Sequence, residues 1–140
     1  MHTLIDTAAL AGNFTTLIGL LQAGSLIDTL RTSGPYTLFA PTDAAFRRLV
    51  PGALDELQKD TVRLYQFLAL HVVPRLVLLK DVTSGAIETL GGASLTAVRA
   101  GGEVFVNGVN ISRADIEASN GVMHVVDEVL LPFGKKLTRT

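Results

Sequence analysis

The strongest constraint on this fold is a change of residue pattern near Ser84. Before Ser84, apolar residues recur at helical spacing between capping residues, and after it short β-branched runs are separated by glycine-containing pairs. Those pairs are Gly91-Gly92, Gly101-Gly102, Asn107-Gly108 and Asn120-Gly121. Glycine and asparagine tolerate the positive φ angles of tight hairpin turns. The pattern therefore predicts short helices followed by an antiparallel β meander, which is an α+β fold.

The first part of the chain predicts three short helices. Thr3 and Asn13 are expected to cap the first two, because a side-chain oxygen can accept hydrogen bonds from the free amides of a helical N-terminus. Glycines follow both apolar stripes and are expected to end these helices. Ser25 resembles the first residue of a capping box and predicts a third helix over Leu26–Leu30.

The next segment predicts a strand that runs directly into a helix. Tyr36–Ala40 is an apolar run closed by Pro41, which fits a short buried strand. Thr42 or Asp43 is expected to cap the following helix, and Phe46 lies on the apolar stripe of that helix. We therefore expect Phe46 to be buried.

Two further elements follow from the same reasoning. A later helix opens at Asp60 and must end before Pro74, which places His71 on its apolar stripe near the C-terminus. Towards the end of the chain, Val122–Leu131 predicts a long apolar strand in the middle of the sheet.

Composition limits both the number of domains and the class of partner. The chain has 140 residues, of which 48% are apolar and 18% are charged. We expect one compact domain over residues 1–134 and a flexible basic tail over residues 135–140. The net charge of -1, from 12 basic and 13 acidic residues, creates no field that would attract nucleic acid. We expect a monomer in solution.

The N-terminal region bears on membrane insertion and export. The segment from Thr7 to Ile27 is uncharged, but glycines and polar residues interrupt it too often for a bilayer span. Met1–Asp6 lacks the basic residues that precede the apolar part of an export signal. We therefore expect no membrane insertion, and either a cytoplasmic chain or a mature form from which an export signal was removed.

Residues suited to catalysis or metal binding are sparse. The chain has no cysteine, and its histidines are His2, His71 and His124. No nucleophile elbow, zinc-protease pair, phosphate loop or EF-hand spacing occurs. We expect no enzyme activity, no cofactor and no metal site; a hydrolase with His71 or His124 beside a hydroxyl is the least favoured alternative. Both of these histidines are expected to be buried and hydrogen-bonded, with a lowered pKa.

Three segments resemble the motifs of the fasciclin-like domain family. They are Thr37–Phe46, Leu70–Pro74 and Ala118–Pro132, and they occur in the family's order. The cysteine-free chain is most similar to bacterial single-domain members of that family. The resemblance implies a fasciclin-like fold in which short N-terminal helices pack against an antiparallel β wedge.

The same resemblance implies a function. It indicates a non-enzymatic module for cell adhesion or matrix interaction, whose partner is a cell-surface or matrix protein or a polysaccharide. The implied location is secreted, periplasmic or on the cell surface. A soluble small-ligand-binding protein is the alternative, and a closed apolar pocket with a few converging polar groups would favour it.

The resemblance also implies roles for single residues. Integrin-binding animal members carry an Asp-Ile dipeptide where this chain has Asp115-Ile116, and His71 lies at their tyrosine-histidine position, with Leu70 in place of the tyrosine. Asp115, Ile116 and His71 are therefore the candidate partner-binding residues. The residues alone leave another interpretation open, in which Ile116 is core and Asp115 caps a turn. Fold-defining roles are implied for Phe39, Pro41, Thr42, Asp43, Phe46, Asn120, Gly121, His124 and Asp127.

Overall fold

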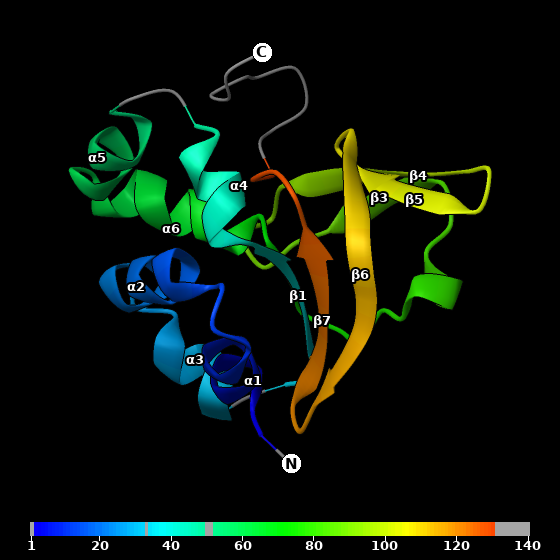
Figure 1. The fold of residues 1–140 in the computed structure, drawn as a ribbon, viewed down its shortest axis with the longest axis horizontal. Coiled ribbons are helices and arrows are strands. Elements are labelled where there is room, and N and C mark those ends of the chain that lie inside the picture. Colours follow the sequence, from blue (N-terminus) through cyan, green and yellow to red (C-terminus); the bar gives the residue numbers. More distant parts are fainter. Residues whose placement is uncertain (1, 33, 50–51, 131–140) are drawn as a thin grey trace.

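A computed structural model of the protein describes residues 2–32, 34–49 and 52–130. Helices gather on one side of the molecule and a twisted sheet forms the other side (Figure 1). The elements are, in chain order, α1 (Leu4–Ala11), α2 (Thr15–Ala23), α3 (Ile27–Thr32), β1 (Tyr36–Pro41), α4 (Asp43–Arg47), α5 (Ala53–Gln58), α6 (Thr61–Ala69), β2 (Val72–Val73), the 3-10 turn η1 (Leu79–Asp81), β3 (Gly85–Glu88), β4 (Ser94–Ala100), β5 (Glu103–Val106), β6 (Val109–Ala118) and β7 (Gly121–Val126). The α+β prediction is confirmed.

The sheet has the strand order β2-β1-β7-β6-β5-β4-β3. Strands β3 to β7 form the predicted antiparallel meander. Strand β1 pairs with β7 in parallel, which was not predicted. This pair joins the helical half of the chain to its last strand, and local residue patterns do not encode such a distant partner. The short strand β2, at the edge beside β1, was not predicted.

The cap of α2 differs from the prediction. Asn13 is not the cap; Phe14 occupies the N-cap position and makes no side-chain cap hydrogen bond. Asp43, from the start of α4, instead accepts hydrogen bonds from the Thr16 amide (2.8 Å) and from the Thr15 hydroxyl (2.8 Å). These bonds lower the pKa of the Asp43 carboxyl, with the Thr16 amide contributing most. A carboxylate at a helix N-terminus is favourable whichever segment supplies it.

Other helix boundaries are close to their predictions. Thr3, Thr42 and Asp60 each accept a cap hydrogen bond from the first turn of the helix that follows, so these caps are confirmed. The third helix begins at Ile27 and not at Leu26, which places Ser25 one residue too early to be its N-cap. The displacement is one residue, within the usual uncertainty of helix ends.

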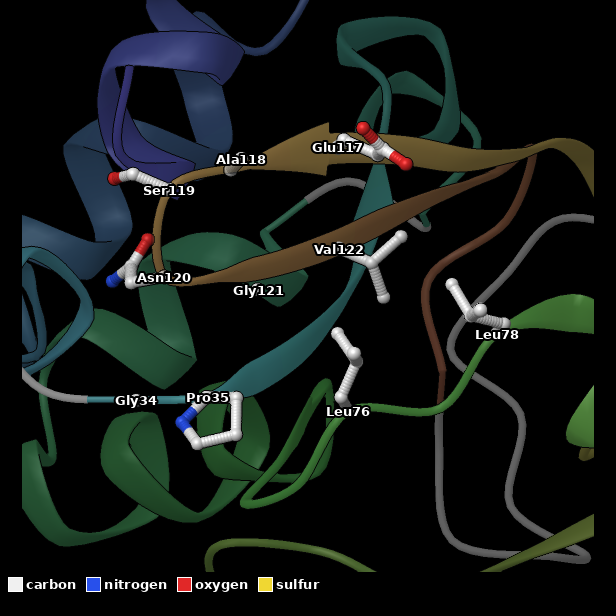
Figure 2. Close-up of a pocket in the computed structure, with 10 residues that line it drawn as sticks. All are labelled: Gly34, Pro35, Leu76, Leu78, Glu117, Ala118, Ser119, Asn120, Gly121 and Val122. Carbon is white, nitrogen blue, oxygen red and sulfur yellow. The ribbon is translucent and has the colours of Figure 1, made fainter. Parts of the chain in front are cut away.

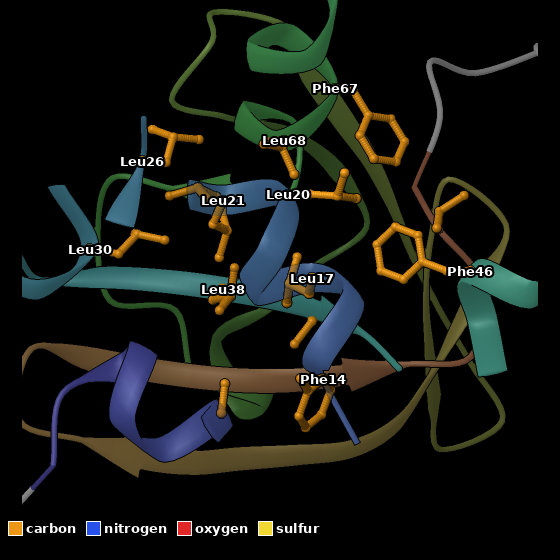
Figure 3. Packing of buried hydrophobic residues seen from close by; sticks show 14 of the residues in the cluster. Phe14, Leu17, Leu20, Leu21, Leu26, Leu30, Leu38, Phe46, Phe67 and Leu68 are labelled. Carbon is orange, nitrogen blue, oxygen red and sulfur yellow. The ribbon is translucent and has the colours of Figure 1, made fainter. Parts of the chain in front are cut away.

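Two apolar clusters lie on opposite faces of β1 and β7. The helix-side cluster contains Leu38 and Phe46 together with side chains from α1, α2 and α6. Figure 3 shows Leu38 and Phe46 beside the side chains of α2 and α6. The meander-side cluster contains Phe39 and Val126 together with side chains from β3, β4 and β5. Successive residues of a strand point to opposite faces, so β1 and β7 supply both clusters. We call these two strands the spine.

The last predicted strand is shorter than expected. It ends at Val126, and Val129 and Leu130 are buried outside any strand. Leu131 and the predicted basic tail over residues 135–140 lie outside the described residues. Within the described part of the chain, none of the helices has the length and apolar character needed to cross a bilayer.

Candidate functional site

The candidate residue Asp115 lies in a bulge of β6. The register between β6 and β7 shifts on both sides of Arg113, and Asp115 has a φ of 59°. Positive φ is uncommon for a residue other than glycine, and a bulge turns a side chain away from the regular direction of its strand. Asp115 therefore does not lie in the turn that follows β6; it is held within the strand in an unusual conformation.

Asp115 connects β6 to the loop that follows β2. Its Oδ1 accepts a hydrogen bond of 2.9 Å from the Leu79 amide, the first residue of η1. Its own amide donates to Nδ1 of His124 at 3.1 Å. The carboxylate thus caps a turn, as one interpretation expected, but that turn belongs to a segment 36 residues away in sequence. The Asp115 side chain remains 46% exposed.

His124 holds the same loop from the inside. The ring is buried, and Nε2 donates to the Val77 carbonyl at 2.8 Å while Nδ1 accepts from the Asp115 amide. These two bonds require a neutral imidazole with its proton on Nε2. Burial lowers the pKa of His124, and the Val77 hydrogen bond and the Asp115 carboxylate oppose this effect only partly. Imidazole and Phe39 ring centroids are 5.6 Å apart.

A third polar side chain fastens the loop to β1. The hydroxyl of Thr37, which is fully buried, donates to the Arg75 carbonyl at 2.7 Å and accepts from the Val77 amide at 2.7 Å. We call residues 75–79 the wall segment. Because Thr37, Asp115 and His124 all bind it, the wall segment has a fixed position against the sheet.

The wall segment borders an open groove of about 560 Å³. We call it the hairpin groove, and its lining residues are Gly34, Pro35, Leu76, Leu78, Glu117, Ala118, Ser119, Asn120, Gly121 and Val122. Leu76 points from the wall segment towards Val122 of β7, while Glu117 lies on β6 across the groove (Figure 2). Leu76 is 49% exposed, although its neighbours Arg75 and Val77 are both hydrogen-bonded to the Thr37 hydroxyl.

The Asn120-Gly121 turn forms part of the groove lining. A Cβ on Gly121 would lie 1.9 Å from the carbonyl oxygen of Tyr36, so only glycine permits this approach of β7 to β1. The side chain of Asn120 accepts a hydrogen bond from the Leu4 amide at 2.9 Å and thereby ties α1 to the turn.

Ile116 and His71 do not lie on this surface. Ile116 is partly buried and packs against the helix-side cluster, whereas the Asp115 carboxylate is directed to the wall segment. The two adjacent side chains therefore serve different faces, and Ile116 has the core position that the alternative interpretation expected. Adjacent side chains of a regular strand point to opposite faces, and this pair keeps that arrangement in spite of the bulge.

His71 is 1% exposed, which excludes contact between its ring and a partner in this conformation. Its Nδ1 donates to the Phe67 carbonyl at 2.9 Å and its Nε2 accepts from the Leu130 amide at 2.9 Å. Burial lowers the pKa of His71 to about 4. The hydrolase interpretation needs an exposed histidine, and neither His71 nor His124 has a free ring nitrogen. Among the described residues no cluster of potential ligands could hold a metal ion.

Comparison with known proteins identifies the family. The Fasciclin domain family matches residues 12–132 of this chain. The chain belongs to the fasciclin domain family. Protein sll1483 of Synechocystis is 39% identical over 132 residues, which span 93% of this chain and 73% of that protein. Human periostin is 34% identical over 113 residues, spanning 79% of this chain and 14% of periostin.

A solved structure is similar as well. The FAS1 domain pair of the insect cell adhesion molecule Fasciclin I superposes with a TM-score of 0.72 at 20% identity, covering 93% of this chain and 51% of that one. At this identity the likeness shows the fold. The fasciclin fold of the chain thus agrees with the expected architecture of helices against a sheet.

The remaining motif residues of this fasciclin domain have packing or capping positions, with one exception. Phe39 and Pro41 are buried in β1, Thr42 caps α4, and Phe46 is 4% exposed in the helix-side cluster. Asp127, the exception, is exposed just after β7. The hairpin groove itself was missed by the sequence reasoning, since Leu76 and Leu78 carry no recognisable motif.

Proposed function

We propose that this fasciclin domain is a non-catalytic, extracellular adhesion module that binds a cell-surface or matrix protein or polysaccharide through the hairpin groove. The observation that carries the proposal is Leu76, an exposed leucine on a segment fastened by three polar side chains. An apolar anchor that is already ordered loses little conformational entropy when a partner covers it. Such anchors contribute a large share of binding energy at interfaces.

The lining of the groove also carries negative charge. Glu117 is exposed and lines the groove, and Asp115, which is bonded to Leu79 of the wall segment, is partly exposed. A basic group on the partner can form a charge-assisted hydrogen bond with either carboxylate while an apolar group contacts Leu76. Asp115 would act in two ways, by contributing charge and by positioning the wall segment.

The family supports the same class of function. The neighbour of known structure is a cell adhesion molecule that carries the fasciclin fold in paired domains. Residues 1–134 of this chain are proposed to form one such domain, acting outside the cell. Because a single small groove gives limited affinity, display of several copies on a surface would strengthen attachment through multivalency.

A matched pair of variants tests the groove. Leu76 is 49% exposed and Val98, on β4 outside the lining of the groove, is 46% exposed. Leu76→Ser is expected to reduce adhesion of fibroblasts or bacterial cells to wells coated with the protein by about fivefold, equivalent to ~1 kcal/mol. Val98→Ser removes a similar apolar surface and is expected to leave adhesion unchanged. Equal losses in both variants, or no adhesion of either cell type above uncoated wells, would contradict the proposal.

A further inference from the structure

A second groove lies on the opposite, helix-facing side of the β6–β7 hairpin. It has a volume of about 380 Å³. We call it the helix-side groove, and its lining residues are Thr7, Leu10, Ala11, Asn13, Phe14, Arg113, Ile116, Met123 and Val125. Its volume is in the range of roughly 300–1,000 Å³ that is typical of small-molecule sites. Its walls come from α1, the α1–α2 connection and the two strands.

The interior of this groove is apolar. Phe14, Met123 and Val125 are buried side chains of the helix-side cluster, and Ile116 packs against that cluster from β6. On the rim, Leu10 is 69% exposed, the most exposed of the large apolar side chains in the described residues. An apolar ligand that covers Leu10 and Ile116 would remove their surface from water, which is favourable.

The charge on the rim of the groove is positive. Arg113 is exposed and is the only charged residue among those lining the helix-side groove. Within the described residues, the structure shows no ion pair or hydrogen bond for the guanidinium of Arg113. Thr7 and Asn13 add a hydroxyl and an amide that can donate hydrogen bonds. An anionic head group therefore complements this rim, whereas a cationic one would be repelled.

We propose that the helix-side groove binds small amphiphilic carboxylates, of the class of short fatty acids. The carboxylate pairs with the planar guanidinium of Arg113, which favours two parallel hydrogen bonds to such a group. The aliphatic chain lies over Ile116 and against Leu10. The presence of a single cation and the small volume favour a small ligand over an acidic protein segment. This site is separate from the hairpin groove, and its existence does not depend on the proposed adhesion function.

Methyl-detected NMR titration with octanoate tests the site. We expect octanoate to shift the methyl signals of Ile116, Met123 and Val125, while Val122 in the hairpin groove stays unshifted. Octanol has the same chain without the charge and is expected to bind about tenfold more weakly, because a charge-assisted bond is lost. Octyltrimethylammonium, with the opposite charge, is expected to cause no shift at these methyls.

Two arginine variants separate the specific contact from general charge. Arg113→Gln is expected to raise the Kd for octanoate about tenfold, and Arg113→Lys, which keeps the charge, by less. Arg63→Gln changes net charge equally, but Arg63 is an exposed residue of α6 away from the groove lining, so the Kd should not change. The unligated methyl spectrum and thermal midpoint of each variant establish that it is folded. Equal affinity for octanol and octanoate, an equal loss in Arg63→Gln, or shifts confined to other methyls would overturn the proposal.

Discussion

The spine and the wall segment differ in how they are held. The spine strands β1 and β7 pair along their whole length, and Leu38 and Phe39 anchor them in opposite apolar clusters. The wall segment is fixed mainly by the polar side chains Thr37, Asp115 and His124, and only Val77 of this segment is buried in the meander-side cluster. Stability is unevenly distributed in proteins, and binding segments commonly belong to the less stable part. We therefore expect substitutions in the spine to lower folding stability, and substitutions in the wall segment to alter the hairpin groove.

The largest effect should come from Gly121→Ala in the spine. The added Cβ would lie 1.9 Å from the Tyr36 carbonyl oxygen, so β1 and β7 could not keep their pairing. We expect a loss of more than ~4 kcal/mol of unfolding free energy, measured by urea denaturation, or no folded protein at all.

Gly108→Ala is the matched control for Gly121→Ala. It also has a positive φ, of 82°, but a Cβ there would meet nothing within 4 Å. Its cost should be the ~1–2 kcal/mol of the left-handed conformation alone. Equal costs at the two glycines would show that close approach in the spine is unimportant.

The next largest effect is expected from Phe46→Ala. Phe46 is 4% exposed within the helix-side cluster, and removing its ring leaves a cavity. The unfolding free energy should fall by ~3–5 kcal/mol, seen as a lower denaturant midpoint. Tyr65→Ala, at a residue that is 39% exposed on α6, should change the free energy by only ~0.5 kcal/mol. A midpoint for Phe46→Ala equal to that of the parent would refute its role in the core.

Acid should lower the unfolding free energy through protonation of His71. Burial lowers the pKa of His71 to about 4 in the folded state, against 6.5 when the ring is exposed to water. The unfolded chain therefore binds a proton first, and stability falls as the pH is lowered from about 6.5 to about 4. Over this pH range, His71 should lower the unfolding free energy by about 3 kcal/mol, at roughly 1.4 kcal/mol per pH unit.

Urea denaturation between about pH 7 and pH 4 measures this loss in the parent and in His71→Gln. The free energy of the variant should depend less steeply on pH, while His124 contributes in the same direction to both proteins. Identical slopes in the two proteins would exclude His71 as a source of the acid sensitivity.

How far the sequence could predict the structure also differs between the two regions. Helices α1 to α4 and α6, the caps at Thr3, Thr42 and Asp60, and the glycine turns follow from local patterns and were predicted, whereas α5 was not. The parallel pairing of β1 with β7 and the replacement of Asn13 by Asp43 as the cap of α2 depend on distant contacts. No spacing along the chain encodes either of them.

The candidate site was predicted only in part. Asp115 was singled out from the family resemblance, but its bulge and its bond to Leu79 require knowledge of which loop crosses β6. Ile116 was assigned to the same surface because the resemblance implies a role for the Asp-Ile dipeptide, whereas its side chain packs against the helix-side cluster. The sequence offered no signal for Leu76, since an exposed leucine in a loop is not a motif.

The central claim is that Asp115 fixes the wall segment without supporting the fold, so Asp115→Ala should have only a small effect on stability. Its loss should lower the unfolding free energy by only ~1 kcal/mol, because the bond that it makes to the Leu79 amide is at the surface. This loss of stability should be confined to the wall segment.

Amide hydrogen exchange of Asp115→Ala, read together with adhesion to coated wells, tests this claim most directly. The Leu79 amide is expected to exchange about tenfold faster than in the parent, which corresponds to ~1.4 kcal/mol of local opening. The amide of Phe39 in the spine should be unchanged, and adhesion should weaken. An unchanged Leu79 rate, or equal acceleration at Phe39 and Leu79, would contradict the account, as would faster exchange at Leu79 with undiminished adhesion.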